Sequence, residues 1–148
     1  MKKYLQMLLF VATLIFLVLL TGCAQITHQV CIRNNCFNVE LAKTPQEQKI
    51  GLMNRTHLTS DKGMLFIFNK EYTYGFWMKD TLIPLDMLWI NSNNTIVYIQ
   101  KDAEPCIVDT CPSYIPDKSG LYVLEINSGL SDEYHISVGE KVEFVNIN

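Results

Sequence analysis

Two carboxylates stand inside apolar segments, where charged side chains are uncommon. Asp86 lies within the run Leu85–Ile90, and Glu125 lies within the run Tyr122–Asn127. Burial of an unpaired carboxylate costs several kcal/mol, so each side chain needs a cationic or hydrogen-bonding partner. Two carboxylates that share a pocket can also do general acid-base work on a glycan, or they can bind a small ligand.

The candidate partners of these carboxylates are Arg55 and Lys79, and Asp80 completes the candidate polar cluster. Because a guanidinium can meet a carboxylate through two parallel hydrogen bonds, we expect Arg55 to hold Asp86 or Glu125. Lys79 or backbone N–H groups should satisfy the other carboxylate. Structural networks perturb charges as active sites do, so the sequence favours a network that stabilises the fold and assigns no catalytic residue.

Four of the five cysteines form two pairs with the same short spacing, Cys31 with Cys36 and Cys106 with Cys111. In an oxidising compartment this spacing favours two local disulfides. The same four thiols could instead hold a tetrahedral zinc ion. Cys23 remains outside both pairs.

The N-terminus has the outline of an export signal, in which Lys2 and Lys3 precede an apolar run from Met7 to Leu20. The sequence Leu20-Thr21-Gly22-Cys23 at the end of this run resembles the lipobox of prokaryotic lipoproteins. We therefore expect residues 1–22 to be removed and Cys23 to be lipidated. The lipid would anchor the protein to a membrane on the extracytoplasmic side of the cell envelope. An uncleaved transmembrane anchor is the alternative.

Removing residues 1–22 from the 148 leaves 126, which is the size of one ordinary domain. The loss of two lysines from the 12 Lys and Arg leaves 10 against 15 Asp and Glu. This acidic balance argues against nucleic acid as a partner. A hydrophobic content of 49% and a charged content of 18% exclude a disordered chain.

Metal and cofactor motifs are weak. The three histidines are too scattered for a zinc motif, and no cofactor or metal is expected. Thioethers suit Cu(I), but methionines in apolar strands are more often core residues. Trp77 and Trp89 could stack on sugar rings if exposed, although their apolar surroundings favour the core.

The elements that position these residues are mostly short strands. Apolar and polar residues alternate at 37–41, and Thr44, Pro45 and Glu47 have the spacing of a capping box that opens a helix over 45–54. Short aromatic and branched runs predict the remaining strands, at 64–68, 74–78, 85–90, 95–101, 122–127 and 142–147. The predicted fold is mainly β (α+β), a compact antiparallel barrel or sandwich of short strands with one short capped helix.

The connections have their own signals. Four turn residues at 91–94 predict a tight turn, and 129–134 predict a helical turn. Three prolines and a cysteine pair at 103–119 predict an ordered loop without a strand. We expect a lipidated tether with the first cysteine pair at 23–36, followed by one globular domain at 37–148.

Five segments, in this order, resemble the domain of unknown function 192 family: Gly51-Leu52-Met53-Asn54-Arg55, Gly63-Met64-Leu65-Phe66, Phe76-Trp77-Met78-Lys79-Asp80-Thr81, Ile83-Pro84-Leu85-Asp86, and Leu124-Glu125-Ile126-Asn127 with Gly129. The resemblance implies a small, mostly β fold of bacteria and archaea, often behind an export signal, with no established activity. The chain departs from the family at Asp80, where Asn is usual, and at Ser128, where Ala is usual. The pair Cys106 and Cys111 resembles a pair in some members.

Three functions fit the sequence. The first is a membrane-anchored, non-catalytic binding or accessory module for an unidentified envelope ligand or protein. The second is an envelope hydrolase that acts on glycan through Asp or Glu residues. The third is a purely structural interaction domain. Two carboxylates about 5 to 9.5 Å apart in a cleft would favour the hydrolase, and an exposed concave apolar patch would favour the binding module.

Overall fold

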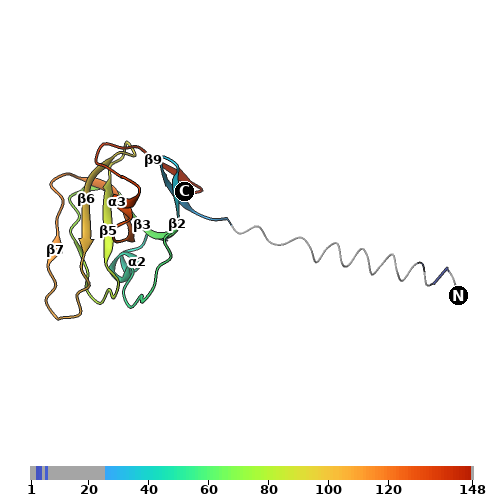
Figure 1. Ribbon diagram of the computed structural model, residues 1–148, viewed down its shortest axis with the longest axis horizontal. Coiled ribbons are helices and arrows are strands. Elements are labelled where there is room, and N and C mark those ends of the chain that lie inside the picture. Colours follow the sequence, from blue (N-terminus) through green and yellow to red (C-terminus); the bar gives the residue numbers. More distant parts are fainter. Residues whose placement is uncertain (1–2, 5, 7–25, 148) are drawn as a thin grey trace.

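A computed structural model describes residues 3–4, 6 and 26–147, and the chain from residue 26 onward builds one curled sheet with small additions (Figure 1). The seven-stranded sheet has the order β6-β5-β8-β3-β2-β1-β9, and a second sheet pairs β4 with β7. The elements are β1 Gln29–Ile32, β2 Asn35–Ala42, α2 Pro45–Ile50, β3 Lys62–Tyr72, β4 Phe76–Trp77, β5 Leu85–Ile90, β6 Ile96–Ala103, β7 Ser113–Tyr114, β8 Gly120–Asn127, α3 Leu130–Glu133 and β9 Val142–Val145.

The large sheet is mixed, because β2 and β3 run parallel while the other neighbours run antiparallel. Two parallel strands need a crossover connection, which α2 and the loop behind it supply. The sheet curls until the chain before β9 reaches the start of β6. There the backbone N–H of Ile96 donates to Glu140 O at 2.9 Å, and that of Gly139 donates to Ile96 O at 2.8 Å. The result is a half-barrel of mainly β structure, as the sequence predicts.

Both faces of the central strands are buried. Alternate residues of a strand point to opposite faces, so Leu88 and Leu124 join an inner cluster to which all seven strands contribute. Trp89 and Val123 point to the outer face, where they pack with Leu52 from the α2 crossover. This double burial explains why β5 and β8 are apolar runs without clear alternation.

Helix α2 begins as its capping box predicts. Thr44 Oγ1 accepts a hydrogen bond from the Glu47 backbone N–H at 3.2 Å, and Glu47 Oε2 accepts one from the Thr44 N–H at 2.8 Å. The backbone N–H groups of Thr44 and Lys43 both donate to the Glu47 carboxylate and lower the pKa of this carboxyl group. The expected end at residue 54 is wrong, because Gly51 adopts φ 50° and ψ −132°, a conformation suited to glycine, and ends the helix at Ile50.

The first strand lies inside the sheet, between β2 and β9. Cys31 and Cys36 are directly opposite each other in the β1–β2 hairpin, with their Cα atoms 4.0 Å apart, and they form a disulfide. The sheet therefore begins at Gln29, and the first cysteine pair is part of it. The expected boundary at residue 37 falls inside β2.

Some elements match their predicted bounds closely and others do not. β5 has the predicted bounds, and the predicted helical turn at 129–134 is α3. The loop 103–119 contains β7, where no strand is predicted. Two residues are too few to produce an alternating pattern, so β7 has no sequence signal and forms because it pairs with β4.

Cys23 and residues 7–22 of the expected signal lie outside the described residues. Within the described ranges, no helix is both long and apolar enough to span a membrane.

Candidate binding site

Asp86 and Glu125 lie on opposite faces of the sheet. In the pairing of β5 with β8, Asp86 is opposite Ile126 and Met87 is opposite Glu125. Since partners in register share a face, Asp86 points to the inner face with Ile126, and Glu125 points to the outer face with Met87. The expected single polar cluster is therefore not formed. The two carboxylates cannot act as an acid-base pair across one cleft.

Asp86 is fully buried and has hydrogen-bond partners. Its Oδ1 accepts from the Asp102 backbone N–H at 3.0 Å, and its Oδ2 accepts from the Ser131 N–H at 2.9 Å. Ser131 lies in the first turn of α3, whose N-cap Gly129 has no side chain to supply a hydrogen bond. Asp86 thus takes the role of a capping side chain for α3 and fixes this helix on the sheet.

Glu125 is only 4% exposed, and its carboxyl group makes no hydrogen bond or ion pair with any residue in the described part of the chain. Its neighbours across β3 and β5 are Met64 and Met87. Burial raises the pKa of Glu125 to about 8, because desolvation disfavours the charged form. The carboxyl group is therefore mostly neutral at pH 7, able both to donate and to accept a hydrogen bond.

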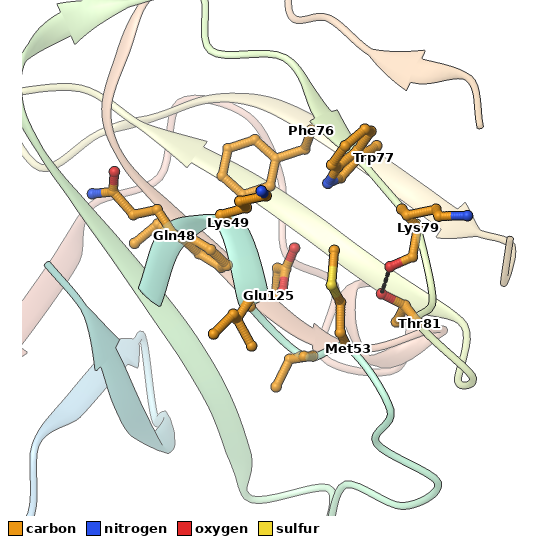
Figure 2. A pocket seen from close by; sticks show the side chains of 12 residues that line it. Gln48, Lys49, Met53, Phe76, Trp77, Lys79, Thr81 and Glu125 are labelled. Carbon is orange, nitrogen blue, oxygen red and sulfur yellow. Dashed lines mark hydrogen bonds between the residues drawn. The ribbon is translucent and has the colours of Figure 1, made fainter. Parts of the chain in front are cut away.

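The carboxyl group of Glu125 points into a small pocket on the outer face (Figure 2). The cavity has a volume of about 20 Å³, which is room for one group of the size of a water molecule. Its lining comes from α2 and the residues behind it, from β3, β4 and β8, and from the segment after β4: Gln48, Lys49, Ile50, Gly51, Leu52, Met53, Phe66, Phe76, Trp77, Lys79, Thr81 and Glu125.

An aromatic groove, formed by Phe68, Tyr74, Phe76 and Trp77, continues from this pocket. A hollow of about 120 Å³ shares Phe76 and Trp77 with the pocket, and a wider one of about 530 Å³ shares Phe68 and Tyr74 with that hollow. Gln48 lines all three. The pocket and the two hollows thus adjoin one another between α2 and β4.

Trp77 is 45% exposed at the rim of the pocket, so the expectation that it belongs to the core is wrong. The reason is that β4 belongs to the small sheet with β7 and not to the seven-stranded sheet. Trp89 is fully buried, as expected, and its Nε1–H donates to Tyr74 O at 2.9 Å. The exposed indole is therefore the one that could stack on a ligand.

Specific contacts hold the walls of the groove. Gln48 Nε2 donates to Ile67 O at 2.8 Å and ties α2 to β3. On the opposite wall of the groove, the hydrogen bond from Trp89 to Tyr74 O ties the segment before β4 to β5. The ring of Phe76 meets that of Phe66 edge to face, with centroids 4.8 Å apart. Gly63 admits the backbone of Glu125, since a Cβ atom at residue 63 would lie 2.5 Å from the Glu125 carbonyl oxygen.

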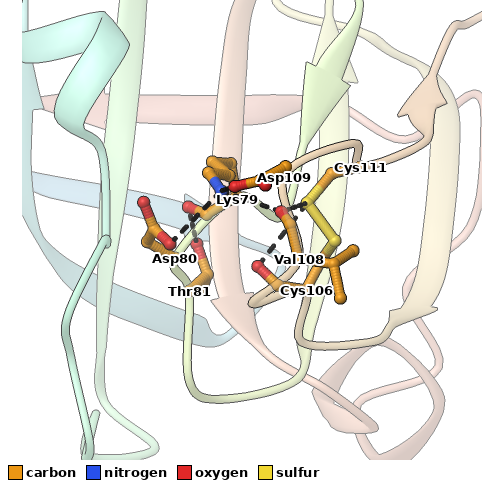
Figure 3. Close-up of polar contacts among 7 residues, drawn as sticks. All are labelled: Lys79, Asp80, Thr81, Cys106, Val108, Asp109 and Cys111. Atoms are coloured by element: carbon orange, nitrogen blue, oxygen red, sulfur yellow. Dashed lines mark hydrogen bonds and ion pairs between the residues drawn. A yellow bond between two sulfur atoms is a disulfide. The ribbon is translucent and has the colours of Figure 1, made fainter.

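Lys79 does not pair with either buried carboxylate, which corrects the second expected partner. Its Nζ donates to Val108 O at 2.8 Å and lies 3.7 Å from Asp80 and 4.0 Å from Asp109 (Figure 3). Asp80 has φ 53°, a left-handed conformation that Asn and Asp tolerate better than most residues. An Asp at position 80 is therefore compatible with this backbone.

The expected partner of Arg55 is also wrong. Its guanidinium pairs with Glu40 at 2.5 Å, and both side chains are largely exposed, at 37% and 53%. The hydrogen bond with Glu40 raises the pKa of Arg55. Because α2 ends at Ile50, Arg55 lies on the following loop beside β2, away from the buried carboxylates.

The second cysteine pair also forms a disulfide. Cys106 and Cys111 have their Cα atoms 6.0 Å apart, and Asp80 N–H donates to Cys106 O at 2.8 Å. This contact holds the loop beside the pocket wall. The four thiols are thus used in disulfides and not as zinc ligands, and no group of three or more His, Cys, Asp or Glu among the described residues is placed to hold a metal ion.

Gln48 and Phe76 are functional candidates that the sequence does not single out, whereas Trp77 is considered there as a residue that could stack on a sugar ring and is expected in the core. Gln48 belongs to no recognisable motif, and a glutamine on a short helix does not by itself indicate a binding role. The sequence does not predict the exposure of Trp77, because this exposure depends on the small sheet of β4 and β7.

Comparisons with known proteins agree with this fold. Residues 28–144 match the DUF192 family, described as uncharacterized ACR. A structure of a protein of unknown function from Novosphingobium aromaticivorans is 34% identical, with a TM-score of 0.72, and the match covers 84% of this chain and 88% of that one. A "putative transcription regulator" from Sinorhizobium meliloti is 32% identical, with a TM-score of 0.71, covering 83% and 98%.

A comparison with curated proteins gave no match. The family match extends over most of the chain and reaches every strand of the seven-stranded sheet, with only the last residue of β9 outside it. The chain therefore belongs to the domain of unknown function 192 family.

Proposed function

We propose that this protein is an exported, lipid-anchored binding module of the cell envelope, and that it holds its ligand in the aromatic groove. The export signal at 1–22 and the lipobox cysteine Cys23 support the location. The adjoining pocket and hollows between α2 and β4 support the binding role. The module is attached to the membrane through the lipid, and its ligand is a component of the envelope.

The observation that carries this proposal is the carboxyl group of Glu125. Buried polar groups in native proteins are almost always hydrogen-bonded, because an unmade hydrogen bond is costly. Glu125 is buried, points into a pocket and has no partner among the described residues. A ligand group that enters the pocket supplies the missing partner.

The other two functions have less support. A hydrolase needs two carboxylates at one cleft, whereas Asp86 and Glu125 are on opposite faces and Asp80 does not line the pocket. A purely structural domain has no need for an exposed aromatic groove that ends at an unpaired acid. The Sinorhizobium protein is named for transcription, but the net charge of −3 in this chain argues against direct DNA contact.

Ligand screening with groove variants tests the binding role. Full-length protein in a detergent without a sugar head group is titrated with neutral tetrasaccharides, tetralysine and citrate, and the heat of binding is measured. We expect at least one class to bind the native protein and a control variant, Val138→Ala, which changes an exposed residue outside the groove. Trp77→Ala should bind the same ligand at least 10-fold more weakly, a loss typical of an exposed aromatic contact. The binding role is wrong if no class binds, or if Trp77→Ala binds as well as the native protein.

Mass spectrometry of the native N-terminus tests the anchor. We expect the chain to begin at Cys23 and to carry acyl groups, and Cys23→Ser should leave the export signal uncleaved. An intact Met1 on the membrane-bound native protein would contradict lipid anchoring and would favour the uncleaved anchor.

A further inference from the structure

The pocket at Glu125 restricts the chemistry of its ligand through size. A volume of about 20 Å³ admits one group such as a hydroxyl, but not a carboxylate or a phosphate. The wider hollows next to it, of about 120 and 530 Å³, leave room for the rest of a larger molecule. The ligand therefore inserts a small polar tip and lies along the groove.

Charge restricts the ligand further. Burial raises the pKa of Glu125 to about 8, so the acid is mostly neutral at pH 7. The charged side chains that line the pocket are Lys49 on α2 and Lys79 after β4. The Lys79 ammonium is held by Val108 O and two aspartates, and Figure 2 shows it turned away from Glu125. Among the residues that line the pocket, a cationic tip would meet two ammonium groups and no carboxyl group other than Glu125.

A neutral acid is best matched by a group that both donates and accepts a hydrogen bond. A hydroxyl group does this with one atom, because its oxygen accepts from the acid while its hydrogen is donated to the carbonyl oxygen. An ammonium group has no acceptor. In a cavity of about 20 Å³, which has room for one small group, the carboxyl of Glu125 is thus matched by a hydroxyl.

Aromatic rings at the rim of the pocket form an apolar surface next to the polar carboxyl group of Glu125. Trp77 is 45% exposed, and Phe76 lies beside it on β4. The faces of aromatic rings carry partial negative charge and attract the partly positive hydrogen atoms of C–H bonds. A molecule with one C–H face and several hydroxyl groups can contact both the aromatic rings at the rim and the carboxyl group of Glu125.

We propose that the groove binds a saccharide, with one hydroxyl group in the pocket at Glu125 and one sugar ring stacked on Trp77. This inference rests on the proposed binding role and names its ligand class. Gln48, which lines the pocket and both hollows, lies along the path of the next sugar unit.

Titration of full-length protein with cellotetraose and tetra-N-acetylchitotetraose tests the inference and separates plain hexoses from N-acetylated ones. At pH 6 we expect one of the two to bind the native protein and Glu125→Gln with affinities within about 3-fold, because an amide also donates and accepts. Glu125→Leu should bind at least 10-fold more weakly. At pH 9 the native protein should bind about 10-fold more weakly than at pH 6, since the acid is then ionised, and Glu125→Gln should not change. Thermal unfolding of each variant verifies that it is folded.

Three results would overturn the saccharide inference. One is tight saccharide binding by Glu125→Leu, which would place the sugar outside the pocket. Another is loss of binding in Glu125→Gln, which would mean that an ionised carboxylate is recognised. The third is Trp77-dependent binding of tetralysine or citrate without any saccharide, which would keep the binding role and change its ligand. Binding of no class would remove both proposals.

Discussion

Asp86 and Glu125 lie on neighbouring strands and are both almost fully buried, but their surroundings differ. On the inner face, two backbone N–H groups donate to the Asp86 carboxylate. On the outer face, Glu125 has two methionines beside it and an open pocket in front of it. The difference teaches that a carboxylate within an apolar strand can stabilise the fold or face a ligand. The distinction depends on whether the free N–H groups at the start of a helix lie against the carboxylate, as those of α3 do at Asp86.

Removal of the Asp86 carboxylate should have the largest effect on stability. In Asp86→Leu, the N–H groups of Asp102 and Ser131 lose their acceptor, and hydrogen bonds to a charged group contribute about 1.5 to 3 kcal/mol each. We expect a loss of roughly 3 to 6 kcal/mol in urea unfolding. Asp117→Leu, at an exposed position, is the control. A loss below about 1 kcal/mol would mean that Asp86 does not hold α3.

The ionisation of Glu125 should make stability depend on pH. Its pKa is about 8 in the folded protein and near 4.5 in the unfolded chain, so the folded state binds more protons between these values. The stability that this proton supplies is fully present below pH 4.5 and is lost as the pH rises towards 8. We expect the native protein to lose a few kcal/mol relative to Glu125→Gln between pH 5 and pH 8.5. Glu104→Gln, at an exposed position, should follow the native curve, and parallel curves for native protein and Glu125→Gln would contradict the raised pKa.

Removal of each disulfide in turn tests whether the pocket on the outer face depends on the nearby loop. Each closes a loop of six residues, so the chain-entropy model predicts a loss of about 2 kcal/mol when either pair is changed to serine. The loop of Cys106 and Cys111 contacts a residue of the pocket wall, because Lys79 Nζ donates to Val108 O at 2.8 Å. Removal of the disulfide between Cys106 and Cys111 should therefore change Trp77 fluorescence and ligand affinity, whereas removal of the disulfide between Cys31 and Cys36 should change neither. Equal fluorescence changes in both double variants would show that the outer face does not depend on its own loop.

Arg55→Ala should have the smallest effect. The pair with Glu40 is largely exposed, and exposed ion pairs contribute at most about 1 kcal/mol. Arg33→Ala, which removes the partner of a Glu140 side chain that is only 15% exposed, should cost more in thermal unfolding. A loss above about 2 kcal/mol for Arg55→Ala would indicate that Arg55 reaches a buried carboxylate after all.

Local signals in the sequence predict much of the fold. The capping residues Thr44 and Glu47 determine where α2 begins, and the apolar run Leu85–Ile90 coincides with β5. The parallel pairing of β2 with β3 is not predictable in this way, since it depends on the path of the crossover. The end of α2 was missed because a glycine at position 51 can continue or end a helix, and only its φ and ψ decide.

The site was less predictable than the fold. The sequence identified Glu125 and Asp86 as unusual, and both are buried. It placed them together because strand patterns indicate which residues share a face within one strand, but not the register between two strands. That register, Asp86 opposite Ile126, puts the carboxylates on different faces. The exposure of Trp77 depends on the pairing of β4 with β7, which leaves no pattern in the sequence.

The position of β1 has a mechanical consequence. A pulling force that reaches the domain along the chain from its N-terminal side acts first on Gln29 and Val30, which can peel away from β2 and β9. Peeling from β2 stops at Cys31, where the covalent bond to Cys36 transfers the load into β2. From β2 the load passes to β3 through their parallel pairing, at the centre of the sheet. The short disulfide loop, which contributes about 2 kcal/mol to stability in the chain-entropy model, thus also acts as a mechanical stop against tension on the chain.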